Sequence, residues 1–182
     1  DRVTVALKNG REEDFDCVVI GAHANEALRM LGDPSAQEQK LLGAWTYTRN
    51  RTVLHTDESA MPWTKKSWAS WNYILENSPA AGSPVSLTYD MNRLQNLKTV
   101  KNYFVTLNRH KPLDPESVIR QIDYTPPSYT WDSLRTQEKL PSLNGVQRTF
   151  FCGSYFGYGF HEDAVKSALA VASSFGQGLH PL

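Results

Sequence analysis

The sequence predicts an α+β fold in which strand and helix elements at the two ends of the chain flank a mainly antiparallel sheet. The first residues read as strands followed by helices, and the middle of the chain has β-branched and aromatic residues at period two. The last residues read as a strand, a glycine-rich turn and a helix. We therefore expect residues 1–43 and 146–182 to form one discontinuous domain and residues 44–145 to form another.

The composition is that of an ordinary globular protein of 182 residues, 40% of them hydrophobic. Lys plus Arg and Asp plus Glu both number 19, so net charge gives no reason to expect a nucleic-acid partner. No apolar run approaches the roughly 20 residues of a membrane span, which leaves only peripheral membrane contact open. Cys17 and Cys152 lie in apolar runs, and two buried thiols favour a reducing, cytoplasmic compartment over a disulfide framework.

The chain begins with two predicted strands and two predicted helices. Alternation over residues 3–7 indicates a half-exposed strand, and Asn9-Gly10 supplies a tight turn. The next strand, within 15–22, contains an unbroken apolar run that suits burial on both faces. Helical spacing follows at 23–31 and again from Pro34 to about Leu42.

The middle of the chain predicts an antiparallel sheet that Pro126-Pro127 ends. A loop rich in Pro and Ser at 78–84 separates two of its strands. A modest amphipathic helix and a final strand follow at 131–140 and 148–152. The strands of the sheet are expected within 45–54, 68–74, 85–89, 103–107 and 118–124.

The glycine-rich turn is the first candidate site. Gly153, Gly157 and Gly159 lead directly into a helix, so backbone amides and the positive end of the helix dipole could approach a ligand. An ordinary tight connection is the alternative. The dinucleotide fingerprint GxGxxG is absent from the whole sequence.

The helix after the turn has a predicted core face and a polar start. Glu162 and Asp163 are first-turn acids that favour the helix dipole. His161 could contact a cofactor ring or donate a hydrogen bond to a reaction intermediate, or it could be a packed or capping histidine. The core face is expected to consist of Ala164, Val165, Ala168, Leu169 and Ala172.

Metal and hydrolytic sites are disfavoured by spacing. The five histidines have no metal-ligand spacing, so we expect no metal. A hydrolase using Ser154 is weakly supported, because no Gly-x-Ser-x-Gly elbow and no nearby base occur. Aromatic side chains on the sheet could line an apolar substrate cavity or simply form core, and Asn72 and Asn92 are polar exceptions that could face such a cavity. These aromatic residues are Trp45, Tyr47, Trp68, Trp71, Tyr73 and Tyr89.

Several stretches together resemble a known family. Residues 3–31 and 151–172 resemble segments that flank the substrate domain and close the cofactor site in flavin-containing amine oxidases and phytoene-desaturase-like enzymes. More narrowly, the chain is similar, in order, to predicted NAD/FAD-binding oxidoreductases associated with cyclopropane fatty-acid synthases. The motifs that carry this narrower resemblance are His55-Thr56-Asp57 with Met61-Pro62, Trp68-Ala69-Ser70-Trp71-Asn72-Tyr73, Met91-Asn92-Arg93-Leu94-Gln95, Phe104-Val105-Thr106-Leu107-Asn108 and Gly157-Tyr158-Gly159-Phe160-His161-Glu162-Asp163.

The resemblance implies the C-terminal part of an FAD-dependent oxidoreductase that dehydrogenates an apolar, lipid acyl-like substrate or an amine. Segments 1–43 and 146–182 would belong to a split FAD-binding domain with Rossmann-like elements, and 44–145 would bind substrate. The partner would be the missing N-terminal FAD-binding half of the same protein. This chain alone would then hold FAD weakly and be inactive. A binding or interaction module that keeps the fold without chemistry is the alternative.

The resemblance also implies residue roles. Gly153 and Ser154 would approach the ribityl and pyrophosphate portion of FAD, although amine oxidases usually have an acidic residue where Ser154 stands. The amides from Gly159 through Phe160 and His161 to Glu162 would meet the pyrimidine edge, and His161 is the candidate catalytic residue. The substrate would be bound by Tyr47, Trp71, Asn72, Tyr73 and Asn92.

Overall fold

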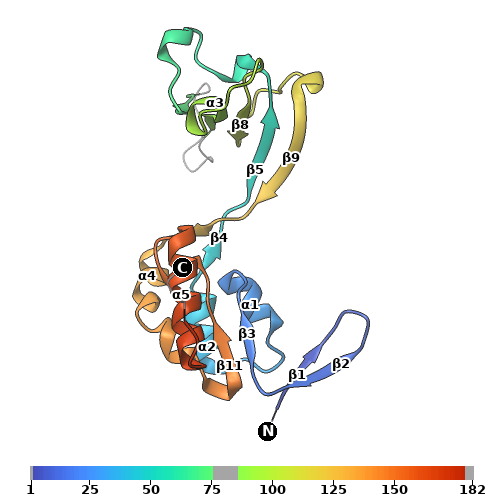
Figure 1. The fold of residues 1–182 in the computed structure, drawn as a ribbon, viewed down its shortest axis with the longest axis vertical. Coiled ribbons are helices and arrows are strands. Elements are labelled where there is room, and N and C mark those ends of the chain that lie inside the picture. The colour runs from blue at the N-terminus through green and yellow to red at the C-terminus, as the bar shows by residue number, and fades with distance from the viewer. Residues whose placement is uncertain (1, 76–85, 179–182) are drawn as a thin grey trace. The chain divides into compact units, whose positions relative to one another are not determined.

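The structure is a computed structural model that describes residues 2–75 and 86–178 and divides into two compact units. Residues 1–47 and 127–182 form the terminal unit, and residues 48–126 form the central unit (Figure 1). Helices are combined with sheets whose ladders are antiparallel, apart from one parallel pair among the described strands. The mixed fold with mostly antiparallel sheets is therefore confirmed. The predicted loop at 78–84 lies outside the described residues.

The terminal unit begins with a hairpin of β1 (Val3–Ala6) and β2 (Glu12–Phe15). Its turn contains Gly10, which has a φ of 82° that glycine adopts without strain. The strand predicted within 15–22 is confirmed as β3 (Val18–Ile20), whereas the hairpin strand β2, which ends at Phe15, was not predicted. The Glu12–Phe15 segment pairs with β1 because its polar residues suit an exposed hairpin.

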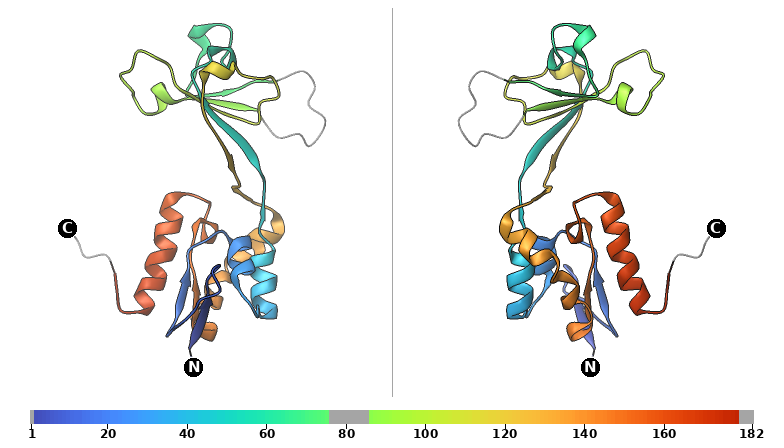
Figure 2. Two further views of the ribbon diagram at one scale, coloured as in Figure 1. Left: turned by 90° about the vertical axis from the view of Figure 1, so that its right-hand side faces the viewer. Right: turned by 90° about the vertical axis from the view of Figure 1, so that its left-hand side faces the viewer.

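A parallel pair of strands forms the centre of the terminal unit. Strand β3 pairs with β11 (Thr149–Phe151), which lies about 130 positions further along the chain. Figure 2 shows α5 (His161–Ser174) on one side of this pair and α2 (Ala36–Gly43) on the other. Val19 is nevertheless 47% exposed, so the prediction that this strand is covered on both faces is wrong.

The helices of the terminal unit enclose its hydrophobic core. Helix α1 (Ala24–Met30) follows β3, and the capping box of Ser35 with Glu38 starts α2. Helix α4 (Trp131–Gln137) and a 3-10 turn at Leu140–Leu143 complete the cover, where a longer helix over 131–140 was predicted. The buried core consists of Ile20, Ala24, Ala27, Leu41, Leu42, Trp45, Leu140, Leu143, Phe151 and Tyr155.

The central unit is a five-stranded antiparallel sheet in the order β6-β7-β8-β5-β9. The predicted strand at 118–124 is confirmed as β9, and the one at 103–107 is shorter by one residue in β8. The helix α3 (Met91–Leu94) and 3-10 turns at Glu58–Ala60, Lys65–Ser67 and Pro115–Ser117 lie in the connections. The strands are β5 (Asn50–His55), β6 (Trp71–Tyr73), β7 (Leu87–Asp90), β8 (Phe104–Leu107) and β9 (Val118–Tyr124).

The sheet of the central unit has two different faces, because neighbouring residues in a strand alternate sides and paired residues share one. The closed face carries the buried side chains of Asn72, Val53, His55, Thr88, Phe104 and Thr106, and Gln121 on its β9 edge is exposed. Apart from the buried Thr52, the open face has exposed or half-buried side chains. It carries Leu54, Trp71, Tyr73, Leu87, Tyr89, Val105, Leu107 and Ile122.

The borders of the two units differ from the predicted 44 and 145. Trp45 is 2% exposed in the core of the terminal unit, and β4 (Thr46–Tyr47) pairs with β10 (Pro127–Ser128) rather than with the large sheet. Leu140 and Leu143 also belong to this core. Segments 44–47 and 127–145 are therefore part of the terminal unit.

The buried face of α5 also differs from the prediction. Val165 is 46% exposed and Ala168 is exposed, whereas Ser167 and Val171 are the buried residues of this helix. The buried hydroxyl oxygen of Ser167 accepts a 2.9 Å hydrogen bond from the amide of Gly153. The side of α5 that faces the turn therefore carries Ser167 rather than a row of alanines.

Candidate functional site

The candidate site is the turn that connects β11 to α5 in the terminal unit. After Phe151 the chain makes a short 3-10 turn at Ser154–Phe156 and then enters α5 at His161. Phe160 precedes the helix in an extended conformation, with φ −84° and ψ 160°. The helix is 14 residues long, so its N-terminus carries a partial positive charge.

The glycines of this turn are required by close packing inside it. A Cβ on Gly157 would collide with the carboxyl group of Asp163, and one on Gly153 would lie 2.7 Å from the Tyr155 ring. Gly159 has a φ of 90°, and its Cβ would lie 2.8 Å from the hydroxyl of Tyr129. These contacts explain why side chains are excluded from the turn. They do not by themselves require a ligand.

Some of the amides in the turn are used internally. The carboxylate of Asp163 accepts from the amides of Tyr158 at 2.9 Å and Phe160 at 3.0 Å. The amide of Gly159 donates to the carbonyl of Ser154 at 3.1 Å. Gly153, Gly159 and Phe160, to which the family resemblance gave a cofactor role, therefore have amides with protein acceptors.

Other amides at the same place donate to no acceptor among the described residues. They belong to Ser154, at the start of the 3-10 turn, and to His161 and Glu162, the first two residues of α5. Their residues are half-buried or exposed, so a ligand can reach them. Three of the six residues assigned to the cofactor thus offer an open backbone donor, and these donors suit a carbonyl or another electron-rich group.

Two side chains that the sequence analysis did not identify hold the turn in place. The amide of Gln137 donates to the carbonyls of Tyr155 at 3.1 Å and Gly157 at 2.6 Å. The hydroxyl of Tyr129 also donates to Gly157, at 3.1 Å. Both residues lie 18 or more positions upstream, so no local sequence pattern could reveal these bonds.

The thiol and phenol groups beside the turn are poor nucleophiles. Burial raises the pKa of the Cys152 thiol, and both Cys17 and Cys152 are free and only half-buried. Burial also raises the pKa of Tyr155, whose hydroxyl is buried without a hydrogen-bond partner among the described residues. His161 is exposed at the first position of α5. The groups of this site that can bind a ligand are therefore mainly its backbone N–H donors.

The predicted substrate residues fall in both units. Tyr47 is in the terminal unit, where its hydroxyl accepts from the amide of Ala24 at 2.7 Å, and burial raises its pKa to about 12. Its ring stacks on His23 with the ring centres 4.8 Å apart. Trp71 and Tyr73 are 65% and 57% exposed on the open face of the central unit.

The two predicted asparagines are used in local structure. Asn72 is buried on the closed face, opposite Trp71 and Tyr73, and its amide donates to the carbonyl of Ala69 at 2.6 Å. Asn92 bridges a loop by accepting from the amide of Tyr103 at 2.8 Å and donating to the carbonyl of Lys101 at 3.0 Å. The alternation of strand β6 separates Asn72 from its aromatic neighbours.

The described residues contain no group of three or more His, Cys, Asp and Glu side chains that could hold a metal ion. They also contain no helix with both the length and the apolar character needed to cross a bilayer.

Comparison with known proteins identifies similar folds but does not assign the chain to a family. No protein-family model matches the chain, and no curated protein matches it in sequence. Among solved structures, the fold is similar to a CLA-producing fatty acid isomerase from P. acnes, with 13% identity and a TM-score of 0.62 over 96% of this chain. It is also similar to a putative protoporphyrinogen oxidase from Exiguobacterium sp. 255-15, with 15% identity and a TM-score of 0.56 over 96% of this chain.

A UDP-galactopyranose mutase has the same fold, with 13% identity and a TM-score of 0.56 over 97% of this chain. The chain spans about 44% of the length of the first two structures and 45% of the third. Each likeness covers nearly the whole of the present chain, so both units take part in the shared fold.

Proposed function

We propose that this chain is part of an FAD-dependent oxidoreductase and that the turn between β11 and α5 holds the flavin. The single observation that carries the proposal is the set of open amides at Ser154, His161 and Glu162, which lie next to a rigid turn and a helix N-terminus. The resemblance noted in the sequence and the fold shared with an oxidase over 96% of the chain support the same conclusion. The residues of the turn fit FAD, because the electron-rich carbonyls of a flavin need hydrogen-bond donors such as these amides.

In this proposal, FAD supplies the hydride-accepting chemistry when it is bound. The amides of His161 and Glu162 hold the pyrimidine edge, and the helix N-terminus stabilises negative charge there. Ser154 donates its amide toward the ribityl and pyrophosphate portion. Gly153, Gly159 and Phe160 shape the backbone, since their own amides are used within the protein.

The substrate in this proposal is a small apolar molecule, either lipid acyl-like or an amine. The open face of the central unit is the binding surface, with Trp71 and Tyr73 as its main contacts. Tyr47 belongs to the terminal unit and is not assigned to this surface, whereas Asn72 and Asn92 would act by holding the strand and loop around them. The FAD-binding role belongs to the terminal unit and the substrate-binding role to the central unit.

The proposal further includes the partner half. A chain that spans 44% of structures with its fold and lacks GxGxxG needs a segment with that fingerprint to hold the rest of FAD. The full-length protein should therefore be purified and its visible spectrum recorded. An oxidised-flavin spectrum that bleaches on anaerobic addition of a fatty acid or an amine supports the proposal. A colourless full-length protein that does not bind FAD would instead favour a non-catalytic binding module.

The open amide at the start of α5 can be tested directly with proline. His161→Pro removes the first N–H of the helix, and the extended Phe160 before it tolerates proline. Loss of one hydrogen bond should weaken FAD binding about tenfold. Trp131→Pro is the matched control, because Trp131 also begins a helix after an extended residue, Thr130. Equal FAD affinity in His161→Pro and wild type would show that the amide of residue 161 does not bind FAD.

The imidazole of His161 needs a separate variant. His161→Ala keeps the amide and removes the ring, so flavin binding should be preserved. If the ring takes part in catalysis, His161→Ala lowers the rate of flavin reduction by substrate. An unchanged rate would leave the backbone donor as the only contribution of this residue.

A further inference from the structure

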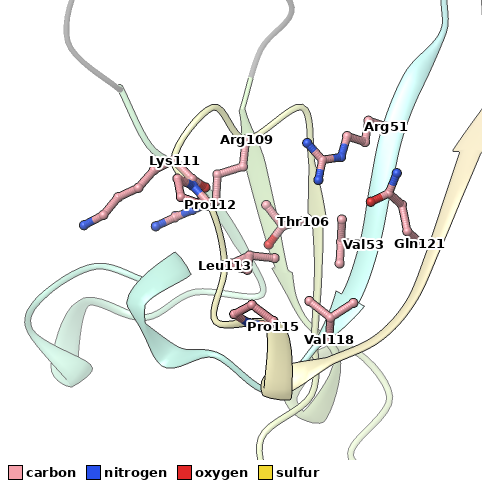
Figure 3. A pocket seen from close by; sticks show the side chains of 10 residues that line it. All are labelled: Arg51, Val53, Thr106, Arg109, Lys111, Pro112, Leu113, Pro115, Val118 and Gln121. Carbon is pink, nitrogen blue, oxygen red and sulfur yellow. Dashed lines mark hydrogen bonds between the residues drawn. The ribbon is translucent and has the colours of Figure 1, made fainter.

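A cavity of about 330 Å³ lies in the central unit, away from the aromatic open face. Residues 51 and 53 of β5, 106 of β8 and 121 of β9 line it, together with the connection that follows β8 (Figure 3). Val53 pairs in register with Thr106 and Gln121, so these side chains share the closed face of the sheet. The volume is within the range of small-molecule sites.

The lining combines positive charge with apolar surface. Three of the ten lining residues are cationic, and none is Asp or Glu, although the whole chain has a formal net charge of zero. Val53 and Thr106 are 6% and 1% exposed and form a buried floor. The cationic residues are Arg51, Arg109 and Lys111, and the apolar ones are Val53, Pro112, Leu113, Pro115 and Val118.

Two arginines approach the cavity from different elements. The guanidinium of Arg109 is held by the backbone, since it donates to the carbonyls of Lys111 at 3.1 Å and Ser59 at 3.0 Å. The guanidinium of Arg51 makes no hydrogen bond or ion pair with any residue in the described ranges. In Figure 3, Arg51 lies on one side of Thr106 and Leu113, and Arg109 lies on the other. Arg51 is therefore an exposed bidentate donor beside an apolar floor.

We propose that this cavity binds an amphipathic anion, with its apolar body against Val53, Leu113 and Val118 and its head group at Arg51. An apolar body alone would not need the cations, and a small inorganic anion would not use the apolar floor. A carboxylate or a phosphate head group fits the same donors. This site goes beyond the proposed flavin chemistry and does not depend on it.

The test uses isotope-labelled full-length protein titrated with octanoate, octyl phosphate and uncharged 1-octanol. Octanoate or octyl phosphate should shift the backbone amide signals of Thr106, Leu113 and Gln121 saturably, and the tighter of the two identifies the head group. Octanol should bind at least about tenfold more weakly, because it lacks the charge-assisted hydrogen bond.

Arg51→Gln should weaken binding of the anion about tenfold for the same reason. Arg120→Gln is the control, since it removes an equal charge from β9 but on the opposite face of the sheet. The proposal is overturned if Arg120→Gln has the larger effect, if the shifts map to Trp71 and Tyr73 and leave Thr106, Leu113 and Gln121 unmoved, or if octanol binds as well as octanoate. Because the shift map is obtained with the wild-type protein, it decides the location even if a variant folds poorly.

Discussion

The imidazole Nε2 of His55 and the hydroxyl of Thr106 form a 2.7 Å hydrogen bond inside the closed face of the central sheet. The other ring nitrogen, Nδ1, accepts from the amide of Asp57 at 3.1 Å, so the neutral ring carries its hydrogen on Nε2. Thr106 in turn lies 2.9 Å from the hydroxyl of Thr88. Three polar side chains thus satisfy one another in a region where neither His55 nor Thr106 is more than 1% exposed.

This arrangement predicts a loss of stability in mild acid. Burial lowers the pKa of His55 to about 4, and Arg109 opposes protonation further, although the charge of Asp57 favours it. The unfolded chain binds the proton near the ordinary pKa of 6.5, so stability is full above that pH and falls as the pH drops toward 4. The expected loss is up to about 2 kcal/mol at pH 5.

Urea unfolding at several pH values measures this loss, and NMR titration of the His55 ring measures its pKa. His55→Gln should flatten the pH dependence of stability between pH 4 and 6.5. A His55 ring that titrates near 6.5 in the folded protein contradicts the prediction.

The same network predicts the effect of removing a hydroxyl. Thr106→Val keeps the shape of the side chain but leaves the His55 N–H without an acceptor in the protein interior. Unfolding free energy should fall by about 1–3 kcal/mol. Thr52→Val is the matched control, because Thr52 lies on the neighbouring strand and makes only a 3.4 Å bond to the carbonyl of Asn50. Equal unfolding midpoints for the two variants would show that the network adds nothing.

The glycine turn predicts an asymmetry between two glycines. An alanine at Gly157 would displace the carboxylate of Asp163, which accepts from two amides of the turn, so we expect a loss of about 1–3 kcal/mol. Gly32→Ala should be neutral or slightly stabilising, because nothing lies within 4 Å of the added Cβ. Thermal unfolding compares them. If Gly157→Ala is as stable as Gly32→Ala, the turn accommodates the added methyl group without displacing Asp163, and the prediction is wrong.

Much of the fold follows from local pattern. Period-two alternation predicts β8 and β9 well, and helix signals predict α1 and α2 to within a few residues, because these patterns reflect burial along a single element. The hairpin strand β2 was missed, since a polar run such as Glu12–Phe15 has no apolar period. Trp45 was assigned to the large sheet because aromatic residues suit both a strand and a helical core.

The candidate site depends more on distant contacts, and the sequence predicts it less completely. The glycines at 153, 157 and 159 identify the turn, but the atoms that fill the space beside them come from Tyr129, Tyr155 and Asp163. Which amides stay open depends on these contacts and on Gln137, which is 20 positions from Gly157. A pattern within a single sequence carries no information about such pairings.

The two faces of the central sheet predict different losses of unfolding free energy when an aromatic residue on each face is replaced by alanine. Phe104 is completely buried on the closed face, where it packs on His55 and Trp68, so Phe104→Ala should cost about 3–5 kcal/mol of unfolding free energy. Trp71 is 65% exposed on the open face and touches Tyr89 edge-on. Trp71→Ala should cost less than about 1 kcal/mol, because little buried surface is lost.

Ligand binding should reverse this order. If the open face binds an apolar substrate, Trp71→Ala weakens binding of a fatty acid or amine to the folded full-length protein, since an aromatic contact is lost. Urea unfolding and substrate titration on the same variants separate the two effects. The opposite result would be a Trp71→Ala protein that is strongly destabilised, or one that binds every tested apolar ligand like the wild type. Either result would show that Trp71 and Tyr73 have a structural role and do not bind substrate.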